Sequence, residues 1–221
     1  MRSGMRQAFQ DELTEVNDQL VQMCQRTSTQ ITDATTALLQ VDLAVAERVL
    51  ESDAEIDHAQ LEIDERVLQL MALQAPVATE LRVVLSAMRH TADIARMGDL
   101  AVHVAKIARM RYPEHTVPEP LRETFAAMGR SAASIGMKAG EVIRTRDLTK
   151  ANQLDEDDDE MDRLHRSLFT TLFDKTDTSP DSRTIETAVD VALLGRYYER
   201  FADHAVEVAA NVQYLVTGTN A

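Results

Sequence analysis

Residues 42–57 read DLAVAERVLESDAEID and residues 147–162 read DLTKANQLDEDDDEMD, and the two segments are identical at seven of 16 positions. A second pair of segments, residues 95–109 and 199–213, is identical at six of 15 positions, at an offset of 104 rather than 105 residues. Two matched pairs in the same order at nearly one offset are typical of a tandem duplication. The chain is therefore predicted to contain two copies of one structural unit.

Helical periodicity fills most of each copy. Apolar residues recur at three- and four-residue spacing up to about residue 40, over about 43–73, and again from 79 onwards. The third stretch is expected to bury one stripe, formed by Leu81, Leu85, Met88, Ala92, Ala95, Val102 and Ala105. Each stripe needs a partner helix. The predicted fold class is therefore all-α, with six helices arranged as a tandem repeat of two antiparallel three-helix bundles.

Prolines mark the boundary between the two copies. Three of the five prolines lie within residues 113–120, and no helix continues through such a segment. We therefore expect the first bundle to cover residues 1–112 and the second to cover residues 121–221, with residues 113–120 as a Pro-rich linker.

The chain is acidic, with 23 Lys plus Arg against 37 Asp plus Glu and a formal charge of −14. Nucleic-acid binding depends on neutralising phosphates with Lys and Arg, so direct contact with DNA or RNA is not expected. No apolar run approaches the ~20 residues that span a bilayer, so membrane insertion is not expected either. Cys24 is the single cysteine, which excludes an intramolecular disulfide and favours a reducing, cytoplasmic location. It is predicted to be a small core residue.

Pairs of acids one helical turn apart occur on the second helix of each copy. Asp53 and Asp57 form the pair in the first copy, and Asp158 and Asp162 hold the matching positions in the second. Like charges four residues apart repel by about 0.2–0.5 kcal/mol, and a bound cation would reverse that sign. Two such pairs on neighbouring helices would supply the oxygen donors that Mg²⁺, Mn²⁺ or iron accepts.

The third helix of the second copy adds Glu199 and Asp203, again four residues apart. The corresponding positions in the first copy are Ala95 and Asp99, so one carboxylate is missing there. Two interpretations of Asp99 stay open. It is either a metal ligand or the partner of Arg96, three residues earlier, in an ordinary helical ion pair.

Other motifs favour structural roles. The six consecutive acids at 155–160 are typical of a solvated face, apart from Asp158. Glu55-Ile-Asp-His58 and Asp162-Arg-Leu-His165 have the spacing used in di-iron helical bundles, but they do not superpose under the repeat. His58 and His165 are therefore predicted to be surface residues. The sequence has no nucleophile elbow, phosphate-binding Gly loop or Cys-rich zinc motif.

Several ordered motifs resemble those of the PhoU family of phosphate-uptake regulators. Gln74-Ala-Pro-Val-Ala-Thr-Glu-Leu-Arg82 resembles the start of the family's third helix, and Asp93-Ile-Ala-Arg-Met-Gly-Asp99 resembles its Asp-Leu-Glu-Arg-Ile-Gly-Asp signature. Arg196-Tyr-Tyr-Glu-Arg-Phe-Ala-Asp-His-Ala205 resembles the signature of the second repeat. The opening Met5-Arg-x-x-Phe9-x-x-x-Leu13 is also similar, so residues 1–4 are expected to be an extension. The resemblance covers essentially the whole chain.

The resemblance implies a cytoplasmic, dimeric accessory protein of the phosphate-specific ABC transporter that is a negative regulator of the phosphate-starvation response. It implies contacts with the transporter's ATPase subunit and with the phosphate-responsive histidine kinase. It also implies metal ions (iron, zinc, manganese or magnesium) held by Glu/Asp-x-x-x-Asp motifs, and the candidate metal ligands are Asp53, Asp57, Asp99, Asp158, Asp162, Glu199 and Asp203. Ala95 stands where the family usually has Glu, and His103 is more simply a structural histidine than a replacement ligand.

Two other function classes stay open at this point. Paired carboxylates would also suit a metal-dependent enzyme such as an oxidase or a phosphoester hydrolase, although no base or phosphate clamp is evident for one. A purely structural bundle would leave the acidic pairs solvated and free of metal. The leading interpretation is a non-enzymatic regulatory adaptor that couples phosphate transport to transcription through protein contacts.

Overall fold

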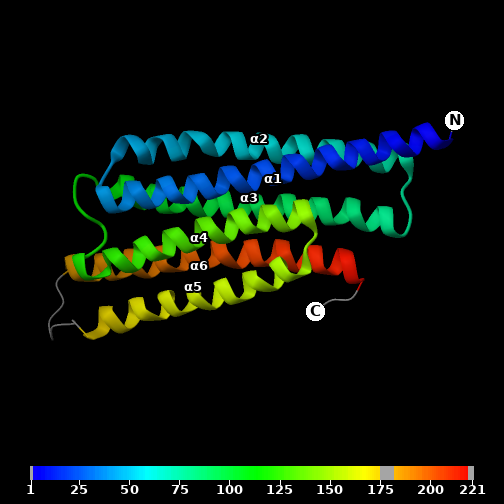
Figure 1. Ribbon diagram of the computed structural model, residues 1–221. Coiled ribbons are helices and arrows are strands. Elements are labelled where there is room, and N and C mark those ends of the chain that lie inside the picture. The colour runs from blue at the N-terminus through cyan, green and yellow to red at the C-terminus, as the bar shows by residue number, and fades with distance from the viewer. Residues whose placement is uncertain (1, 175–181, 219–221) are drawn as a thin grey trace.

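The computed structural model describes residues 2–174 and 182–218 of the chain. Figure 1 shows helices that run side by side along one long axis: α1 (Arg2–Gln40), α2 (Leu43–Gln74), α3 (Thr79–Arg111), α4 (Glu119–Thr145), α5 (Leu148–Asp174) and α6 (Ser182–Thr217). No strand occurs within the described ranges, so the prediction of an all-α fold with six helices is confirmed. None of these helices, over its described residues, has an apolar stretch long enough to cross a bilayer.

Helix starts follow local chemistry, and the two copies use the same capping residue. The side chain of Asp42, before α2, accepts a hydrogen bond from Val45 N at 3.0 Å. The side chain of Asp147, before α5, accepts one from Thr149 N at 2.8 Å. These carboxylates satisfy backbone N–H groups that the first helical turn leaves unpaired. The repeat therefore extends to the detail of how its second helix begins.

The helix α4 begins inside the expected linker. Its first residue is Glu119, so Glu119 and Pro120 lie in its first turn, and Pro118 precedes it as the N-cap. A proline fits the first turn because the N–H groups there have no partner within the helix. The connection between α3 and α4 is therefore residues 112–118.

The helices form two groups of three that share a broad contact. The helices α1, α2 and α3 pack on one another, and so do α4, α5 and α6. The groups meet where α1 lies against α4 and α3 lies against α6, while α2 and α5 lie on the outside, at the top and bottom of Figure 1. Arg111, the last residue of α3, donates from Nε to Asp190 of α6 at 2.6 Å.

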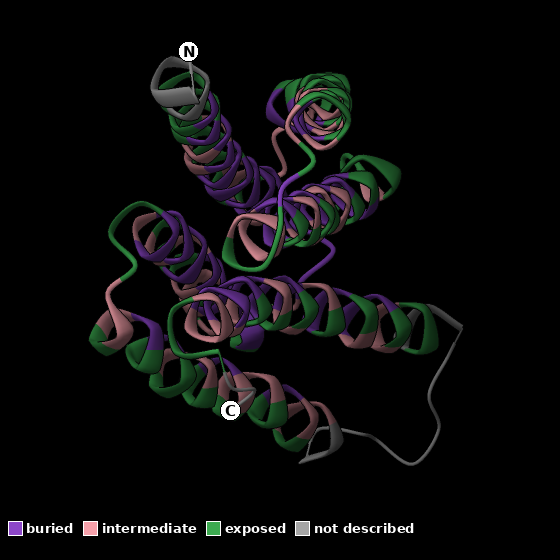
Figure 2. Ribbon diagram, turned by 90° about the vertical axis from the view of Figure 1, so that its right-hand side faces the viewer, coloured by how far each residue is buried: buried purple, intermediate pink, exposed green. Residues whose placement is uncertain are grey.

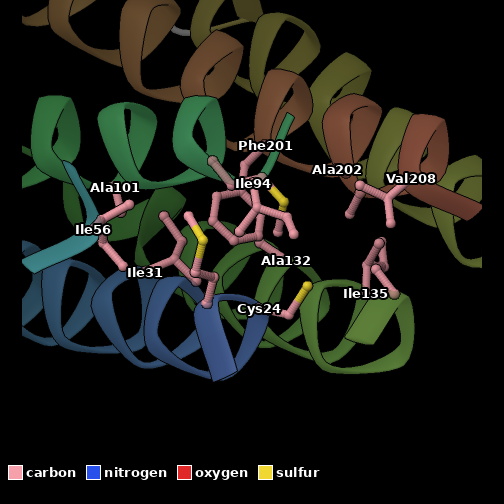
Figure 3. Close-up of a cluster of buried hydrophobic side chains, with 14 of the residues drawn as sticks. Cys24, Ile31, Ile56, Ile94, Ala101, Ala132, Ile135, Phe201, Ala202 and Val208 are labelled. Atoms are coloured by element: carbon pink, nitrogen blue, oxygen red, sulfur yellow. The ribbon is translucent and has the colours of Figure 1, made fainter. Parts of the chain in front are cut away.

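One hydrophobic core runs through all six helices. Figure 2 shows buried residues facing the centre of the bundle and exposed residues facing outward. Figure 3 shows side chains from both groups, including Ile31 of α1 and Ile135 of α4, in one cluster. Cys24 is fully buried, as predicted for a core residue, and burial raises the pKa of its thiol to about 12.

The buried face of α3 differs from the expected stripe. Leu85 is 44% exposed and Ala92 is also exposed, whereas Val84, Thr91 and Ile94 are buried. The helix contacts α1, α2 and α6, so its buried surface is wide and includes residues beside the predicted stripe. The prediction was therefore wrong for the N-terminal part of the stripe, because two neighbouring rows of residues fit the same helical period equally well.

Glycines allow α1 and α4 to approach closely. A Cβ atom at Gly129 would lie 2.5 Å from both Oγ1 and Cγ2 of Thr35, and one at Gly136 would lie 2.5 Å from Ser28 Oγ. Both separations are shorter than real Cβ contacts, so any larger residue must displace its neighbour. Thr35 Oγ1 is also hydrogen-bonded to the buried Tyr198 OH of α6 at 2.8 Å. This contact therefore fixes three helices at once.

The substitution Gly129→Ala is expected to lower the free energy of unfolding by about 1–3 kcal/mol, because the new methyl group overlaps Thr35. At an open helical position the same change would raise stability by roughly 1 kcal/mol, so the sign of the effect reports the close contact. Urea unfolding followed by circular dichroism measures it, with Ser134→Ala at an exposed position of α4 as the control. A Gly129→Ala variant more stable than the wild type would contradict this packing.

His90 is a titratable residue in the core. It is 4% exposed, and its Nε2 has no hydrogen-bond partner among the described residues. Burial lowers the pKa of His90 to about 4, while the charge of Asp93 acts in the opposite direction and that of Arg146 in the same direction. Asp93 Oδ1 lies 3.1 Å from His204 Nδ1 of α6. The folded protein therefore holds His90 neutral at neutral pH.

Acid is expected to destabilise the fold through His90. An unfolded histidine binds a proton below pH 6.5, but folded His90 binds one only below about pH 4. A stability contribution of about 3 kcal/mol is therefore present above pH 6.5 and is lost as the pH falls to about 4. His90→Gln should flatten this part of the curve of unfolding free energy against pH, whereas His58→Gln, at an exposed position, should not. Equal slopes for the wild type and His90→Gln would refute this role.

Candidate functional site

Four acids meet between α5 and α6, and we call them the second-half seam: Asp158, Asp162, Glu199 and Asp203. The two helices lie side by side and run antiparallel (Figure 1). The charges of Asp203, Asp162 and Glu199 all act on Asp158. The structure therefore brings together two pairs that the sequence placed on separate helices.

Two carboxylate oxygens of the second-half seam are buried without a partner. Asp158 Oδ1 and Glu199 Oε2 have no hydrogen-bond partner among the described residues, and the Glu199 side chain is only 12% exposed. Burial, followed by the charge of Asp203, raises the pKa of Asp158 to about 6. The same two causes raise the pKa of Glu199, although Arg196, which donates to Glu199 Oε1, lowers it. Buried carboxylate oxygens without partners are costly, so this seam favours a cation.

Three acids meet between α2 and α3, and we call them the first-half seam: Asp53, Asp57 and Asp99. Burial, followed by the charges of Asp57 and Asp99, raises the pKa of Asp53, while Lys106 and His103 lower it. The lysine supplies a positive charge to this seam within the chain itself. No buried atom without a partner is found among these three acids.

Asp99 forms the helical ion pair that was one of its two interpretations. Its Oδ2 accepts a hydrogen bond from Arg96 Nη1 at 2.9 Å, and its side chain is 40% exposed. Ala95 occupies the position that Glu199 holds in the other half. The first-half seam fits a metal less well than the second-half seam. It has one acid fewer, Asp99 is already paired, and a lysine lies nearby.

The donor set of the second-half seam suits a cation, although its side chains are not arranged around one. Among the residues that the structure describes, no three His, Cys, Asp or Glu side chains converge as they do around a metal ion. Carboxylate oxygens are the ligands that hard cations such as Mg²⁺ and Mn²⁺ prefer. The carboxylates of the four acids are donors of this chemical kind, and the identity of the metal ligands stays a prediction.

His165 lies beside the second-half seam, although a surface position was expected for it. It is half-buried, its Nε2 has no described partner, and its ring packs edge-on to Phe169 with centroids 5.3 Å apart. Burial, followed by the charge of Arg196, lowers the pKa of His165. The spacing of Asp162 and His165, one helical turn apart, was the sequence signal for this position. It was discounted because the first copy has no matching histidine. His58, by contrast, has a 72% exposed side chain, as predicted.

The remaining candidate residues have structural roles. In the acidic run 155–160, the acids at 155, 156 and 159 are exposed as predicted, while Asp157 accepts a hydrogen bond from Lys138 Nζ at 2.6 Å. His103 is exposed, and its ring stacks on Tyr197 of α6 with centroids 5.1 Å apart. His103 therefore has a packing role between the two halves that requires no metal.

Fold and seams together define a class of protein: a six-helix tandem repeat with one acidic seam in each half. A family profile described as "PhoU domain" matches this chain twice, over residues 20–108 and 125–212. The chain therefore belongs to the PhoU domain family, and the resemblance seen in its motifs is confirmed. Each match lies within one group of three helices, in agreement with the predicted duplication.

Full-length relatives and solved structures agree with this assignment. A Mycobacterium tuberculosis protein named "Phosphate-specific transport system accessory protein PhoU homolog 2" is 48% identical over 214 residues, which are 97% of this chain and 99% of that protein. The crystal structure of PhoU from Pseudomonas aeruginosa matches with a TM-score of 0.85 at 29% identity. The match covers 96% of this chain and 100% of the Pseudomonas chain. The phosphate transport system regulatory protein PhoU from Streptococcus pneumoniae matches with a TM-score of 0.84 at 25% identity, covering 96% and 99% of the two chains.

Neutralising Asp158 is expected to stabilise the metal-free protein. In EDTA near neutral pH, Asp158→Asn removes a half-buried charge that faces Asp162, Glu199 and Asp203, so the Tm should rise by about 2–4 °C, corresponding to ~1 kcal/mol. Differential scanning calorimetry measures the change. Asp155→Asn, at an exposed position of the same helix, serves as the control and should leave the Tm nearly unchanged. A lower Tm for Asp158→Asn would mean that this carboxylate already has a favourable partner.

Proposed function

We propose that this chain is a regulatory accessory protein of a phosphate-specific transport system and that it acts through protein contacts rather than by catalysis. The observation that carries the proposal is similarity along the whole chain to a protein of that name, at 48% identity over 97% of its length. Following the family resemblance, the regulation is negative. The protein holds the phosphate-starvation response off when phosphate is plentiful.

The proposed partners are the ATPase subunit of the phosphate ABC transporter and the phosphate-responsive histidine kinase, and the proposed form is a cytoplasmic homodimer. Large apolar side chains on the surface support protein contact. Leu61 and Leu68 of α2 are 67% and 57% exposed, and Ile185 and Val189 of α6 are 54% and 52% exposed. Both helices also carry seam acids, so apolar and negative surface lie on the same elements. Such a surface suits a partner with apolar and basic side chains.

We further propose that the second-half seam holds iron, zinc, manganese or magnesium. The unpartnered oxygens of Asp158 and Glu199 support this assignment. Arg196 holds Glu199 Oε1 and leaves Oε2 available. A bound cation would offset the repulsion among the four carboxylates and join α5 to α6. The first-half seam of Asp53, Asp57 and Asp99 is proposed as the weaker site, because it has one acid fewer and a lysine nearby.

A metal-dependent enzyme is the other function class, and no specific observation favours it. A groove of about 590 Å³ lies between α1 and α2, and its lining includes none of the seven candidate ligands. The relatives that match over the full chain are named for accessory and regulatory roles. Turnover of a phosphoester that Glu199→Ala abolishes would be the result that supports this class.

One paired experiment tests the proposed function. Wild-type protein purified without chelator is analysed for metal and is then titrated against the purified ATPase subunit at high phosphate. We expect stoichiometric metal and saturable binding of the subunit by the wild type. The double variant Glu199→Ala/Asp203→Ala should lose metal because it removes half of the second-half seam. Glu207→Ala, at an exposed position one turn further along α6, is the control and should retain both properties.

The two readouts separate the two parts of the proposal. Folded wild-type protein that shows no association with the ATPase subunit would overturn the adaptor function. Substoichiometric metal that the double variant leaves unchanged would overturn the metal site and leave the adaptor function standing. Metal lost without loss of binding would assign the cation a structural role.

A further inference from the structure

The groove of about 590 Å³ between α1 and α2 is lined mainly by polar side chains. The two helices run antiparallel (Figure 1), so residues of both face each other along its length. Val49 and Ile56 of α2 line it and are each only 2% exposed, so they give it an apolar floor. Binding sites typically measure about 300–1,000 Å³. The groove is therefore large enough to receive a group from outside the chain.

The duplication supplies an internal comparison for this groove. The offset of 105 residues that relates α2 to α5 also relates α1 to α4, because it superposes their buried positions. Leu20, Cys24 and Ile31 of α1 correspond to Phe125, Gly129 and Gly136 of α4, and all six residues are buried. Each residue of the groove can therefore be compared with a residue in the second half.

Gln30 of α1 is a buried polar residue of the groove. It is 5% exposed, and its Nε2 donates to Ser52 Oγ of α2 at 2.9 Å, while its Oε1 has no hydrogen-bond partner among the described residues. A buried amide with an unused acceptor is costly. The fold does not require one, because the matching residue of α4 is Ile135, which is fully buried. The amide therefore serves the groove rather than the core.

The second half has a cation of its own at the corresponding place. Lys138 of α4 donates from Nζ to Asp157 Oδ2 of α5 at 2.6 Å and so joins the two helices. Under the repeat, Asp33 of α1 occupies the position of Lys138, and Ser52 of α2 occupies that of Asp157. The first half therefore has an acid where the second half has the bridging lysine.

The acids of the groove outnumber its arginines. Arg26 and Glu55 lie at one end, where Arg26 Nη1 is 3.6 Å from Glu55 Oε2. Arg48 and Asp33 lie toward the other end, as their positions along the antiparallel helices require. Glu51, between the two ends, is exposed and forms no ion pair with another described residue. One negative charge is left over, so a single cation neutralises the groove.

We propose that this groove docks a basic side chain of a partner protein, with arginine as the preferred anchor. The inference rests on the proposed function, which it deepens by naming the surface and the chemistry of the contact. The aliphatic stem of the arginine lies on Val49 and Ile56, and its guanidinium reaches Glu51 beside the Gln30–Ser52 pair.

Arginine suits the groove better than lysine does. A guanidinium carries five N–H donors in one plane, and the groove offers carboxylate, amide and hydroxyl oxygens as acceptors. Arginine is also enriched among the residues that dominate the energy of protein interfaces. The acidic chain therefore has a defined place for one cationic side chain of its partner.

A blocked arginine tests the site on the full-length wild type. N-acetyl-arginine methylamide and the neutral N-acetyl-citrulline methylamide are titrated into ¹⁵N-labelled protein, and the side-chain amide signals of Gln30 are followed. We expect the arginine compound to shift these signals and to bind at least about 10-fold more tightly than the citrulline compound, because only the guanidinium carries a charge. Unmoved Gln30 signals, or equal affinity for the two compounds, would overturn the site.

Charge reversal tests the docking of the partner. Glu51→Lys changes the groove, and Glu156→Lys makes the same change at the matching exposed position of α5. Circular dichroism checks that both variants are folded. We expect Glu51→Lys to weaken binding of the purified ATPase subunit by at least about 10-fold, and Glu156→Lys to change it by less than about 2-fold. Glu51→Lys should also remove the response of Gln30 to the arginine compound.

The other outcomes separate this inference from the proposed function. Equal losses in the two variants would show an effect of net charge alone and overturn the docking site, as would subunit binding that Glu51→Lys leaves unchanged. Wild type that binds the subunit but not the arginine compound would overturn the inference alone. Wild type that binds the arginine compound but not the subunit would overturn the adaptor function and retain the groove as a site for basic side chains.

A second variant covers the case in which Glu51→Lys fails to fold. Thr29→Arg, at an exposed position on the α1 wall of the groove, places a cation there from within the chain. It should weaken binding of the arginine compound and of the ATPase subunit in the same way. Unchanged binding of both by folded Thr29→Arg would overturn the inference.

Discussion

The rest of the structure depends on the close contact between α1 and α4. The distance between two packed helices is set by the side chains at their contact. Gly129 and Gly136 present none, so the small side chains of Thr35 and Ser28 reach the α4 backbone. This approach also brings α3 against α6 and allows Tyr198 of α6 to reach Thr35. Two bundles that would otherwise need separate cores therefore share one.

The shared core explains why the acidic seams lie where they do. Each seam joins an inner helix, α3 or α6, to an outer helix, α2 or α5. Over the residues that the structure describes, each outer helix contacts only the two other helices of its own group. The core holds the inner helices in place. Repulsion between the acids of a seam therefore mainly weakens the packing of the outer helix. The first half relieves it with Ala95 and Lys106. The second half keeps all four acids, so the repulsion that acts on the attachment of α5 is larger than that on α2.

The sequence predicted those features that arise from local chemistry. The number of helices, the duplication and the pairing of acids follow from the spacing of residues along the chain. These predictions depend only on residues close together in sequence, so packing between helices does not alter them. The buried face of α3 and the position of His165 could not be predicted in the same way. Leu85 is exposed because of which three helices surround α3, and His165 is half-buried because Gly195 on another helix leaves space. Both depend on contacts between residues distant in sequence.

Cys24 lies at the contact that joins the two halves. A Cβ atom at Gly140 would be 3.0 Å from its Cβ, and its thiol is fully buried with a pKa raised to about 12. Only a thiolate reacts readily with alkylating reagents, so modification of this cysteine has to wait until α1 and α4 separate. The chain thus carries its own reporter group. The rate at which Cys24 is labelled in the native protein measures how often the two halves come apart.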